Sequence, residues 1–448
     1  MRRRVVAGFL AILLTCGVML PENVVYAAEN TEVTVEDDSE TNAAETTEKE
    51  STEEKAETVT EQTESSEAIS ETERIEETED DAGITADAKS AVDETVSVDE
   101  LEEIEVTNKM KYATSGKCGD NLTWSYGSGV LTISGTGAMY DYPVYDTPSS
   151  SQCMPWYNYK SAITTVNIAE GVTTIGACAF WGCSSLTSVT TPATISTIGF
   201  GAFCDCSGLQ QVTIKAGFVG ESAFIRCTAL RTVTVGSGVT GFGISAFENC
   251  PGLTGVYISD LAAWCRIDFG GYLSNPLYGA KRLYLNGVEL TDLQIPDGVT
   301  AISDYAFGDA LSITSVTVPA SVQRIGDYAF YQCSNIRTVN LPTSGLNRIG
   351  ASAFDSCTNL GQIAIPDSVS YVGNAAFAWT PIGRVNVKQG VIEGHAFEGC
   401  GCITDVALGS GVTFIGDSAF YRCAALGTVS YGGGHSGRHF KLAATMML

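Results

Sequence analysis

The stretch Ile325-Gly326-Asp327-Tyr328-Ala329-Phe330-Tyr331-Gln332-Cys333 decides the fold, because close copies of it recur along the C-terminal part of the chain. Its Ala-Phe pair occurs ten times, at spacings of 20 to 24 residues except for one gap of 60. Such a period is typical of a solenoid, in which each repeat is one coil whose apolar face is covered only by neighbouring coils. We therefore predict a repeat array. The ten phenylalanines are Phe180, Phe203, Phe224, Phe247, Phe307, Phe330, Phe354, Phe377, Phe397 and Phe420.

The aligned repeats have the consensus Ile-Gly-x-x-Ala-Phe-x-x-Cys-x-x-Leu-x-x-Val-x-Val-Pro. Apolar residues alternate near its end, so pairs such as Ile363 with Ile365 should point inward from short strands. The proline that follows, for example Pro319, removes a backbone donor and ends the strand. The glycine of the Ile-Gly pair, for example Gly199, is expected to supply a permissive backbone before the Ala-Phe corner.

This pattern resembles the BspA-type, or Treponema-type, leucine-rich repeat of bacterial surface proteins, over about residues 163–432. The resemblance implies a leucine-rich-repeat solenoid of short parallel strands with irregular or 3-10 connections. It implies a binding scaffold and not an active site, since the motif describes a fold and carries no chemistry. We expect about eleven to twelve coils, each presenting small polar residues outward.

The formal charge of −27 is concentrated in residues 29–106, which hold 30 acidic and 4 basic residues. The remaining C-terminal part, residues 107–448, has 21 acidic and 18 basic residues and is nearly neutral. A Glu-, Thr- and Ser-rich segment cannot bury enough apolar surface to fold, so we predict that 29–106 is a disordered acidic spacer. No basic face is evident, which argues against a nucleic-acid partner.

The first 28 residues have the pattern of an export signal. Three arginines precede an apolar stretch, Val5 to Leu20, and a small-residue cleavage site ends at Ala27. The stretch is short for a membrane span, and no later segment is a candidate. We therefore predict a secreted or cell-surface protein with no transmembrane segment after the signal peptide. Cys16 belongs to the apolar stretch, although a lipoprotein signal is the alternative interpretation.

Eight cysteines follow a repeat phenylalanine by three residues, where leucine-rich repeats carry a small stacked Asn or Cys. In an exported protein these thiols could form disulfides, but Ala310 and Thr380 replace them singly, which favours packing of free thiols. Two Cys-x-Cys pairs and His395 lack the further ligands of a zinc site. No catalytic, cofactor-binding or metal site is predicted, and the chain is not expected to be an enzyme.

Two segments depart from the repeat. Residues 107–162 are predicted to form a hairpin cap over the open end of the array, with Leu122–Tyr126 and Val130–Ile133 as its strands. An insertion at about 256–292 should contain a helix over Asp260–Ile267 and a hairpin with its turn at Asn286-Gly287. The end, residues 433–448, is an irregular Gly-rich tail in which the repeat stops.

The insertion is the most aromatic part of the repeat region, and its rings either bury the inserted helix and hairpin or form a recognition patch. We predict a secreted or cell-surface scaffold for an extracellular protein or glycan ligand, used for adhesion to host or neighbouring cells. The alternative is a structural or substrate-docking module of an exported glycan-degrading assembly. The candidate ligand contacts are Tyr257, Trp264, Tyr272 and Tyr278 in the insertion, and Arg231, Thr234, Arg337 and Gln362 on the strand face.

Overall fold

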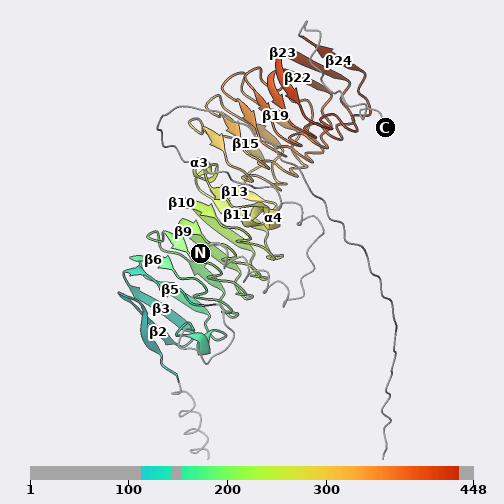
Figure 1. Ribbon diagram of the computed structural model, residues 1–448. Helices are drawn as coiled ribbons and strands as arrows, with labels where there is room; N and C mark the ends of the chain where they lie inside the picture. Colours follow the sequence, from blue (N-terminus) through green and yellow to red (C-terminus); the bar gives the residue numbers. More distant parts are fainter. Residues whose placement is uncertain (1–111, 144–152, 433–448) are drawn as a thin grey trace, which may run out of the picture. The chain divides into compact units, whose positions relative to one another are not determined.

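A computed structural model describes residues 112–143 and 153–432 of the chain. The described part is a solenoid in which successive coils stack through parallel strands (Figure 1). The predicted leucine-rich-repeat solenoid is therefore confirmed. The export signal, the acidic segment 29–106 and the tail 433–448 lie outside the described residues. No helix among the described residues is long and apolar enough to cross a membrane.

The N-terminal cap is a three-stranded antiparallel meander that continues into the first coil. The predicted hairpin is present as β2 (Leu122–Gly127) and β3 (Val130–Gly135), and an additional strand, β1 (Ser115–Gly119), pairs with β2. After β4 (Gly137–Ala138), the 3-10 turn η2 (Tyr157–Tyr159) follows Trp156. Trp156 is fully buried, and its indole N–H donates to the Ala179 carbonyl at 2.9 Å, so the cap closes the core of the first coil.

One ladder of strands runs from the cap to the insertion, along two sides of each coil. The outward-facing side that matters below, the first side, begins where β3 pairs in parallel with β5. The ladder ends where β13 pairs with β14 in the antiparallel hairpin predicted at Asn286-Gly287. Its first-side strands are β5 (Thr165–Ile168), β7 (Ser188–Thr190), β9 (Gln211–Val219), β10 (Thr232–Phe242), β11 (Gly255–Ile258), β13 (Leu283–Leu285) and β14 (Val288–Glu289). The second side adds β6 (Val172–Ile175), β8 (Thr197–Ile198) and β12 (Asp268–Phe269).

The strand ladder restarts after the insertion as two further sheets. The first side continues only through β19, and residues 361–366 form no strand although Ile363 and Ile365 are buried. The prediction of a strand there was wrong, whereas the inward orientation of the two side chains was right. The strands are β15 (Asp292–Gln294), β16 (Ala301–Ile302), β17 (Ser315–Thr317), β18 (Arg324–Ile325), β19 (Thr338–Asn340), β20 (Arg348–Ile349), β21 (Tyr371–Val372), β22 (Arg384–Ile392), β23 (Asp405–Ile415) and β24 (Thr428–Tyr431).

The repeat phenylalanines form two stacks inside the coils. Phe180 to Phe247 stack with ring centroids 5.0 to 5.3 Å apart, and Phe307 to Phe420 stack at 5.2 to 5.5 Å. The insertion joins them with other rings, since Phe242 contacts both Phe247 and Phe269. The core is therefore continuous through the insertion even though the strand ladder is not.

The Ala-Phe corner is a third hydrogen-bonded side of each coil, which the sequence did not predict. In all ten repeats the residues two before and two after the phenylalanine have positive φ, for example Tyr328 (58°) and Gln332 (56°) around Phe330. Alternate N–H groups then point along the array, so that the Phe330 N–H donates to the Ala353 carbonyl of the next coil at 2.8 Å. Side chains at equivalent corner positions consequently stack from coil to coil.

The glycine of the Ile-Gly pair has another role than expected. Gly199 does not have positive φ, so a permissive backbone does not explain it. A Cβ atom at Gly199 would lie 2.5 Å from the Ala177 nitrogen and 2.8 Å from the Gly176 carbonyl carbon of the preceding coil. Gly326 and Gly373 are similarly close to the preceding coil. Glycine is required there because adjacent coils approach each other at the backbone.

The cysteines of the repeat are packed thiols that cap carbonyl groups. None of the fourteen cysteines in the described residues is part of a disulfide. Cys333 is fully buried, and its thiol donates to the Phe307 carbonyl of the preceding coil at 3.0 Å. Seven of the eight repeat cysteines make this bond, at 3.0 to 3.2 Å. The thiol thus satisfies a buried acceptor that the corner leaves open.

We expect the variant Cys333→Ala to be less stable than the parent by about 1 to 2 kcal/mol, because it loses packing and the bond to the Phe307 carbonyl. Urea unfolding followed by circular dichroism measures the change. Reductant should leave the melting temperature of the parent unchanged, since the thiols are free. A drop of several degrees on reduction would instead show that disulfides stabilise the coils.

The insertion contains short helical turns between its strands. Helix α3 (Leu261–Trp264) starts where the Asp260 carboxylate accepts the N–H of Ala263 at 2.9 Å, as the N-cap pattern predicts. The helix is shorter than the predicted Asp260–Ile267. The 3-10 turn η3 (Tyr272–Ser274) and helix α4 (Leu277–Ala280) follow, and they place the two inserted tyrosines next to the following coil.

Candidate functional site

Two groups of tyrosines on different sides of the coils form the candidate recognition surfaces. The first is a pair on the first-side ladder. Tyr257 of β11 lies opposite Tyr284 of β13, and their rings stack with centroids 4.6 Å apart and planes 11° apart. Thr234 of β10 lies opposite Tyr257 on its other side. The strand register therefore brings Thr234 and Tyr257 together, as their outward positions predict.

The tyrosine pair lies along its strands over a glycine. A Cβ atom at Gly255 would lie 3.1 Å from the Tyr257 ring and 3.0 Å from the Tyr284 ring. Both rings are half-buried. Glycine at this position leaves room for the rings to lie close to the sheet, and any larger residue would push them away.

The second group, which we call the tyrosine corner, consists of five tyrosines on the Ala-Phe side. Tyr272 contacts Tyr278 and Tyr331 at centroid distances of 4.6 and 5.6 Å. Tyr331 contacts Tyr328 at 5.5 Å, and Tyr328 stacks on Tyr305 at 5.0 Å. The insertion and the next two coils thus share one aromatic surface, of which Tyr278 is 37% exposed and the other rings are half-buried.

A buried carboxylate holds the tyrosine corner in place. Asp309 is 3% exposed and accepts a hydrogen bond from the Tyr272 hydroxyl at 2.5 Å and from the Lys281 ammonium at 2.5 Å. Burial, followed by the hydrogen bond to Asp309, raises the pKa of Tyr272 well above its usual value. Lys281 also lies 4.9 Å from the centre of the Tyr278 ring. The rings are thereby fixed relative to one another before any partner arrives.

Trp264 is not a ligand contact, contrary to the prediction. Its side chain is 1% exposed, and its indole N–H donates to the Ala306 carbonyl at 2.9 Å. Trp156 makes the same bond to Ala179 at the start of the first stack. Trp264 therefore serves as an internal cap for the second phenylalanine stack, and helix α3 is the element that turns it inward.

The remaining candidates lie apart from one another. Arg231 is exposed just before β10, close to Thr234. Arg337 is exposed just before β19, and Gln362 is exposed one coil further on. These last two belong to the coils beyond the insertion, so the structure does not bring them together with Tyr257. The sequence also gave no reason to choose Tyr305, Tyr328 and Tyr331, although the 23-residue spacing of Tyr305 and Tyr328 would have predicted their stacking.

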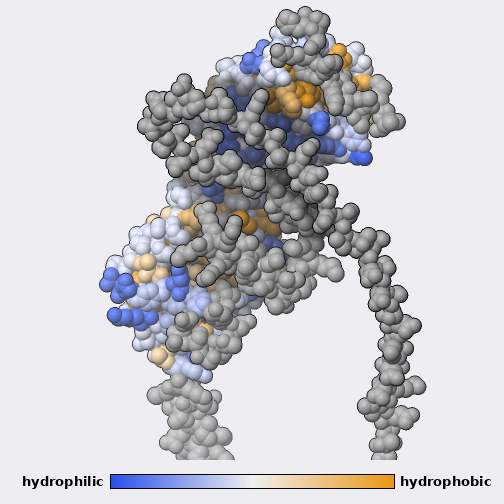
Figure 2. Space-filling model, in the orientation of Figure 1, coloured by the Kyte–Doolittle hydropathy of each residue, from blue (hydrophilic) through white to orange (hydrophobic). Residues whose placement is uncertain are grey.

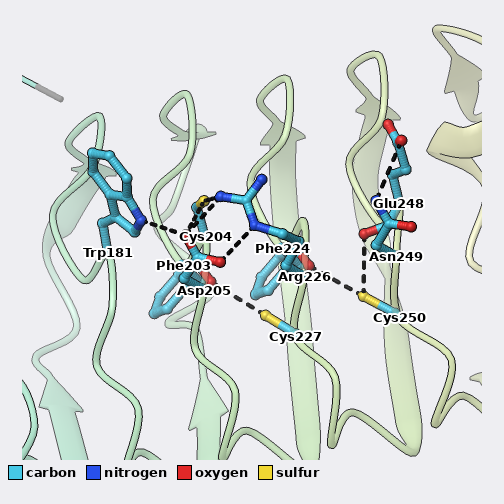
Figure 3. A network of polar contacts seen from close by, with 10 residues as sticks. All are labelled: Trp181, Phe203, Cys204, Asp205, Phe224, Arg226, Cys227, Glu248, Asn249 and Cys250. Carbon is cyan, nitrogen blue, oxygen red and sulfur yellow. Dashed lines mark hydrogen bonds and ion pairs between the residues drawn. The ribbon is translucent and has the colours of Figure 1, made fainter. Parts of the chain in front are cut away.

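A network of polar contacts crosses three coils near the start of the array (Figure 3). Arg226 binds both carboxylate oxygens of Asp205, at 2.6 and 2.7 Å, and Trp181 donates to the same carboxylate at 2.8 Å. Burial alone would raise the pKa of Asp205, but the hydrogen bonds from Arg226 and Trp181 outweigh it and hold the pKa below its usual value. The network links outward residues of neighbouring coils and is a structural clamp.

The thiol beside this clamp is not an activated nucleophile. Burial, followed by the charge of Asp205, raises the pKa of Cys204 far above its usual range, although Arg226 opposes the shift. Burial likewise raises the pKa of Cys400 to about 11, and the thiol donates to the Phe377 carbonyl. His395 pairs with Glu398 at 2.7 Å and not with Cys400. Among the described residues, no group of three or more His, Cys, Asp or Glu side chains could hold a metal ion.

Comparison with known proteins agrees with the repeat geometry. The profile of the BspA type leucine rich repeat region matches six copies, over residues 156–264, 280–400 and 379–434. These ranges cover more than half of the 448 residues and leave out 265–279, the part of the insertion that carries Tyr272 and Tyr278. A search of curated proteins found no match.

Solved structures of similar proteins come from gut bacteria and from pneumococcus. A leucine-rich repeat protein of Eubacterium ventriosum is 24% identical over 70% of this chain and 84% of its own, with a TM-score of 0.43. A leucine rich cell surface protein of Faecalibacterium prausnitzii is 22% identical over 72% and 96%, with a TM-score of 0.32. The pneumococcal vaccine antigen PcpA is 16% identical over 72% and 82%, with a TM-score of 0.33. On the strength of the repeat profile, the chain belongs to the BspA type leucine rich repeat family.

Proposed function

We propose that the protein is an exported scaffold that binds an extracellular macromolecule at the bacterial surface, and that it serves adhesion to host or neighbouring cells. The arginine-led apolar N-terminus supports export. The family supports a binding role, since its repeats build an extended surface. The protein of Faecalibacterium prausnitzii with a similar fold is described as a cell surface protein.

The tyrosine corner is the observation that carries this proposal. Tyrosine is enriched at protein interfaces because its ring is large and rigid and its hydroxyl can pair with polar groups. Here five rings from the insertion and the next two coils are in mutual contact, and Asp309 and Lys281 fix them from beneath. A partner protein that covers them would lose little side-chain entropy, which favours affinity.

Adhesion of beads coated with the full chain to immobilised host matrix proteins and to bacterial cells tests the proposal. The double variant Tyr278→Ala/Tyr331→Ala should weaken adhesion by more than about tenfold, because it removes two anchors of the cluster. Trp379→Ala is the matched control, since Trp379 is a 45% exposed aromatic residue at the corner of another coil. Equal loss in both variants, or no loss in the double variant, would contradict recognition at the tyrosine corner.

The alternative, a substrate-docking module of an exported glycan-degrading assembly, is favoured by the separate tyrosine pair on the first side, which suits a sugar. A glycan array beside the protein screen distinguishes the two functions. Binding to glycans alone, unaffected by the double variant at the tyrosine corner, would support the docking module.

A further inference from the structure

The first side of four successive coils presents only uncharged polar side chains to solvent. Strands β5, β7, β9 and β10 pair in register, so each contributes two outward residues in line with its neighbours. All eight are exposed or half-buried. We call them the polar strand surface; they are Thr165, Asn167, Ser188, Thr190, Gln211, Thr213, Thr232 and Thr234.

The polar strand surface ends at the tyrosine pair. The strand order is β10, β11, β13, and the Tyr284 ring covers the face of Tyr257 that points toward β13. The other face of Tyr257 therefore points toward β10. Because the ring lies over Gly255, which is paired with Thr232, this free face borders the outward side chains of Thr232 and Thr234. The aromatic ring is a wall beside a floor of hydroxyl groups.

The hydroxyl groups of the floor are available to a ligand. Within the described residues, the side chains of Thr213, Thr232 and Thr234 make no hydrogen bond to another protein group. In Figure 2 the visible coils between β2 and β10 are mainly pale, with a few blue patches, as expected for a surface rich in threonine and serine. Such groups bond water in the free protein and can exchange it for ligand hydroxyls at little net cost.

The charged groups near this surface are largely neutralised. Arg282 and Glu289, beyond Tyr284, form an ion pair at 3.7 Å, and Lys215 at the end of β9 pairs with Glu170 at 3.5 Å. Arg231 stands before the start of β10, outside the register of the floor. The floor itself therefore offers neither a cation for an acidic ligand nor an anion for a basic one.

We propose that the polar strand surface and the free face of Tyr257 bind a neutral oligosaccharide, with one sugar ring packed on Tyr257 and the hydroxyl groups of the chain on the threonines. A pyranose has an apolar C–H face and a rim of hydroxyls, which matches an aromatic wall beside polar groups. The strands repeat every ~4.8 Å across the surface, so a linear glycan meets equivalent groups coil after coil. The inference rests on the proposed export of the chain, and it assigns a site distinct from the tyrosine corner.

A microarray of neutral and acidic glycans, probed with the full chain, tests this proposal, and titration calorimetry with the best neutral oligosaccharide measures its affinity. Tyr257→Ala should weaken binding by at least about tenfold, and Thr234→Val by a few-fold, because the latter removes one hydroxyl at nearly constant volume. Tyr257→Phe keeps the ring face and should stay within about threefold of the parent.

Tyr278→Ala is the matched control, since it removes a tyrosine of the insertion from the other side of the coils, and its glycan affinity should equal that of the parent. Binding of acidic glycans alone, of no glycan, or of neutral glycans with unchanged affinity in a folded Tyr257→Ala variant would overturn the proposal. Each of these results leaves adhesion through the tyrosine corner standing, so the two proposals fail separately.

Discussion

Replacing Trp264 with alanine is expected to lower the free energy of unfolding by about 3 to 5 kcal/mol, which is the usual cost of removing a buried large aromatic side chain. The indole is 1% exposed and contacts Phe269 at a centroid distance of 5.4 Å. Its removal also leaves the Ala306 carbonyl without this donor, at the point where the strand ladder is interrupted. Coupling between the coils on the two sides of the insertion should therefore weaken most.

Urea unfolding followed by circular dichroism measures this loss, and hydrogen exchange locates it. Protection should fall first in β15 to β18, next to the insertion, because the stability of a repeat array is nearly a sum of neighbour terms. Trp379→Ala is the control, since this tryptophan is 45% exposed and should cost less than about 1 kcal/mol. Similar losses in the two variants would show that Trp264 does not cap the second stack.

The sequence predicted the interruption but not the orientation of its rings. The gap of 60 residues and the Asn286-Gly287 turn place an irregular segment, and Asp260 starts a helix as expected. The helix is too short for its apolar spacing to define a buried face, so Trp264 could be assigned to either side. Its partner, the Ala306 carbonyl, is 42 residues away and belongs to a coil whose position only the tertiary structure defines.

The phase of the repeat was predictable because it is written in residue types that pack. Every repeat phenylalanine is buried, and so are the alternating residues of the strands. The positive-φ positions of the corner were not predictable, since residues such as Cys178, Tyr305, Ala375 and His395 occupy them and none of these marks a left-handed backbone. The hydrogen bonds to the next coil impose that conformation, and a bond between coils leaves no local trace in sequence.

The candidate site was predicted in part for the same reason. Tyr257 and Thr234 share a face because strand alternation is a local rule. Tyr272 and Tyr278 lie on another side because η3 and α4 follow no repeat and were positioned by Asp309 and Lys281 of the packed structure. The two surfaces are consequently separate, where the sequence suggested a single aromatic patch.

A second large effect is expected for Gly199→Ala, and its sign distinguishes two explanations of the repeat glycine. If backbone freedom alone were the reason, alanine would stabilise the protein by about 0.4 to 1 kcal/mol, because φ at Gly199 is not positive and the unfolded chain would lose entropy. The structure predicts the opposite. The added Cβ would lie 2.5 to 2.8 Å from three backbone atoms of the preceding coil, which cannot move away as a side chain could.

We therefore expect Gly199→Ala to destabilise the protein by about 3 kcal/mol, at the upper end of ordinary overpacking, because two coils must separate locally to accept one methyl group. Gly401→Ala is the matched control, since no atom lies within 4 Å of its Cβ position and its φ is not positive. That variant should be neutral or slightly more stable. Urea midpoints of the two variants give the comparison, and a stabilised Gly199→Ala protein would mean that the coils are further apart than the backbone hydrogen bond from Gly199 to Ile175, 2.8 Å long, requires.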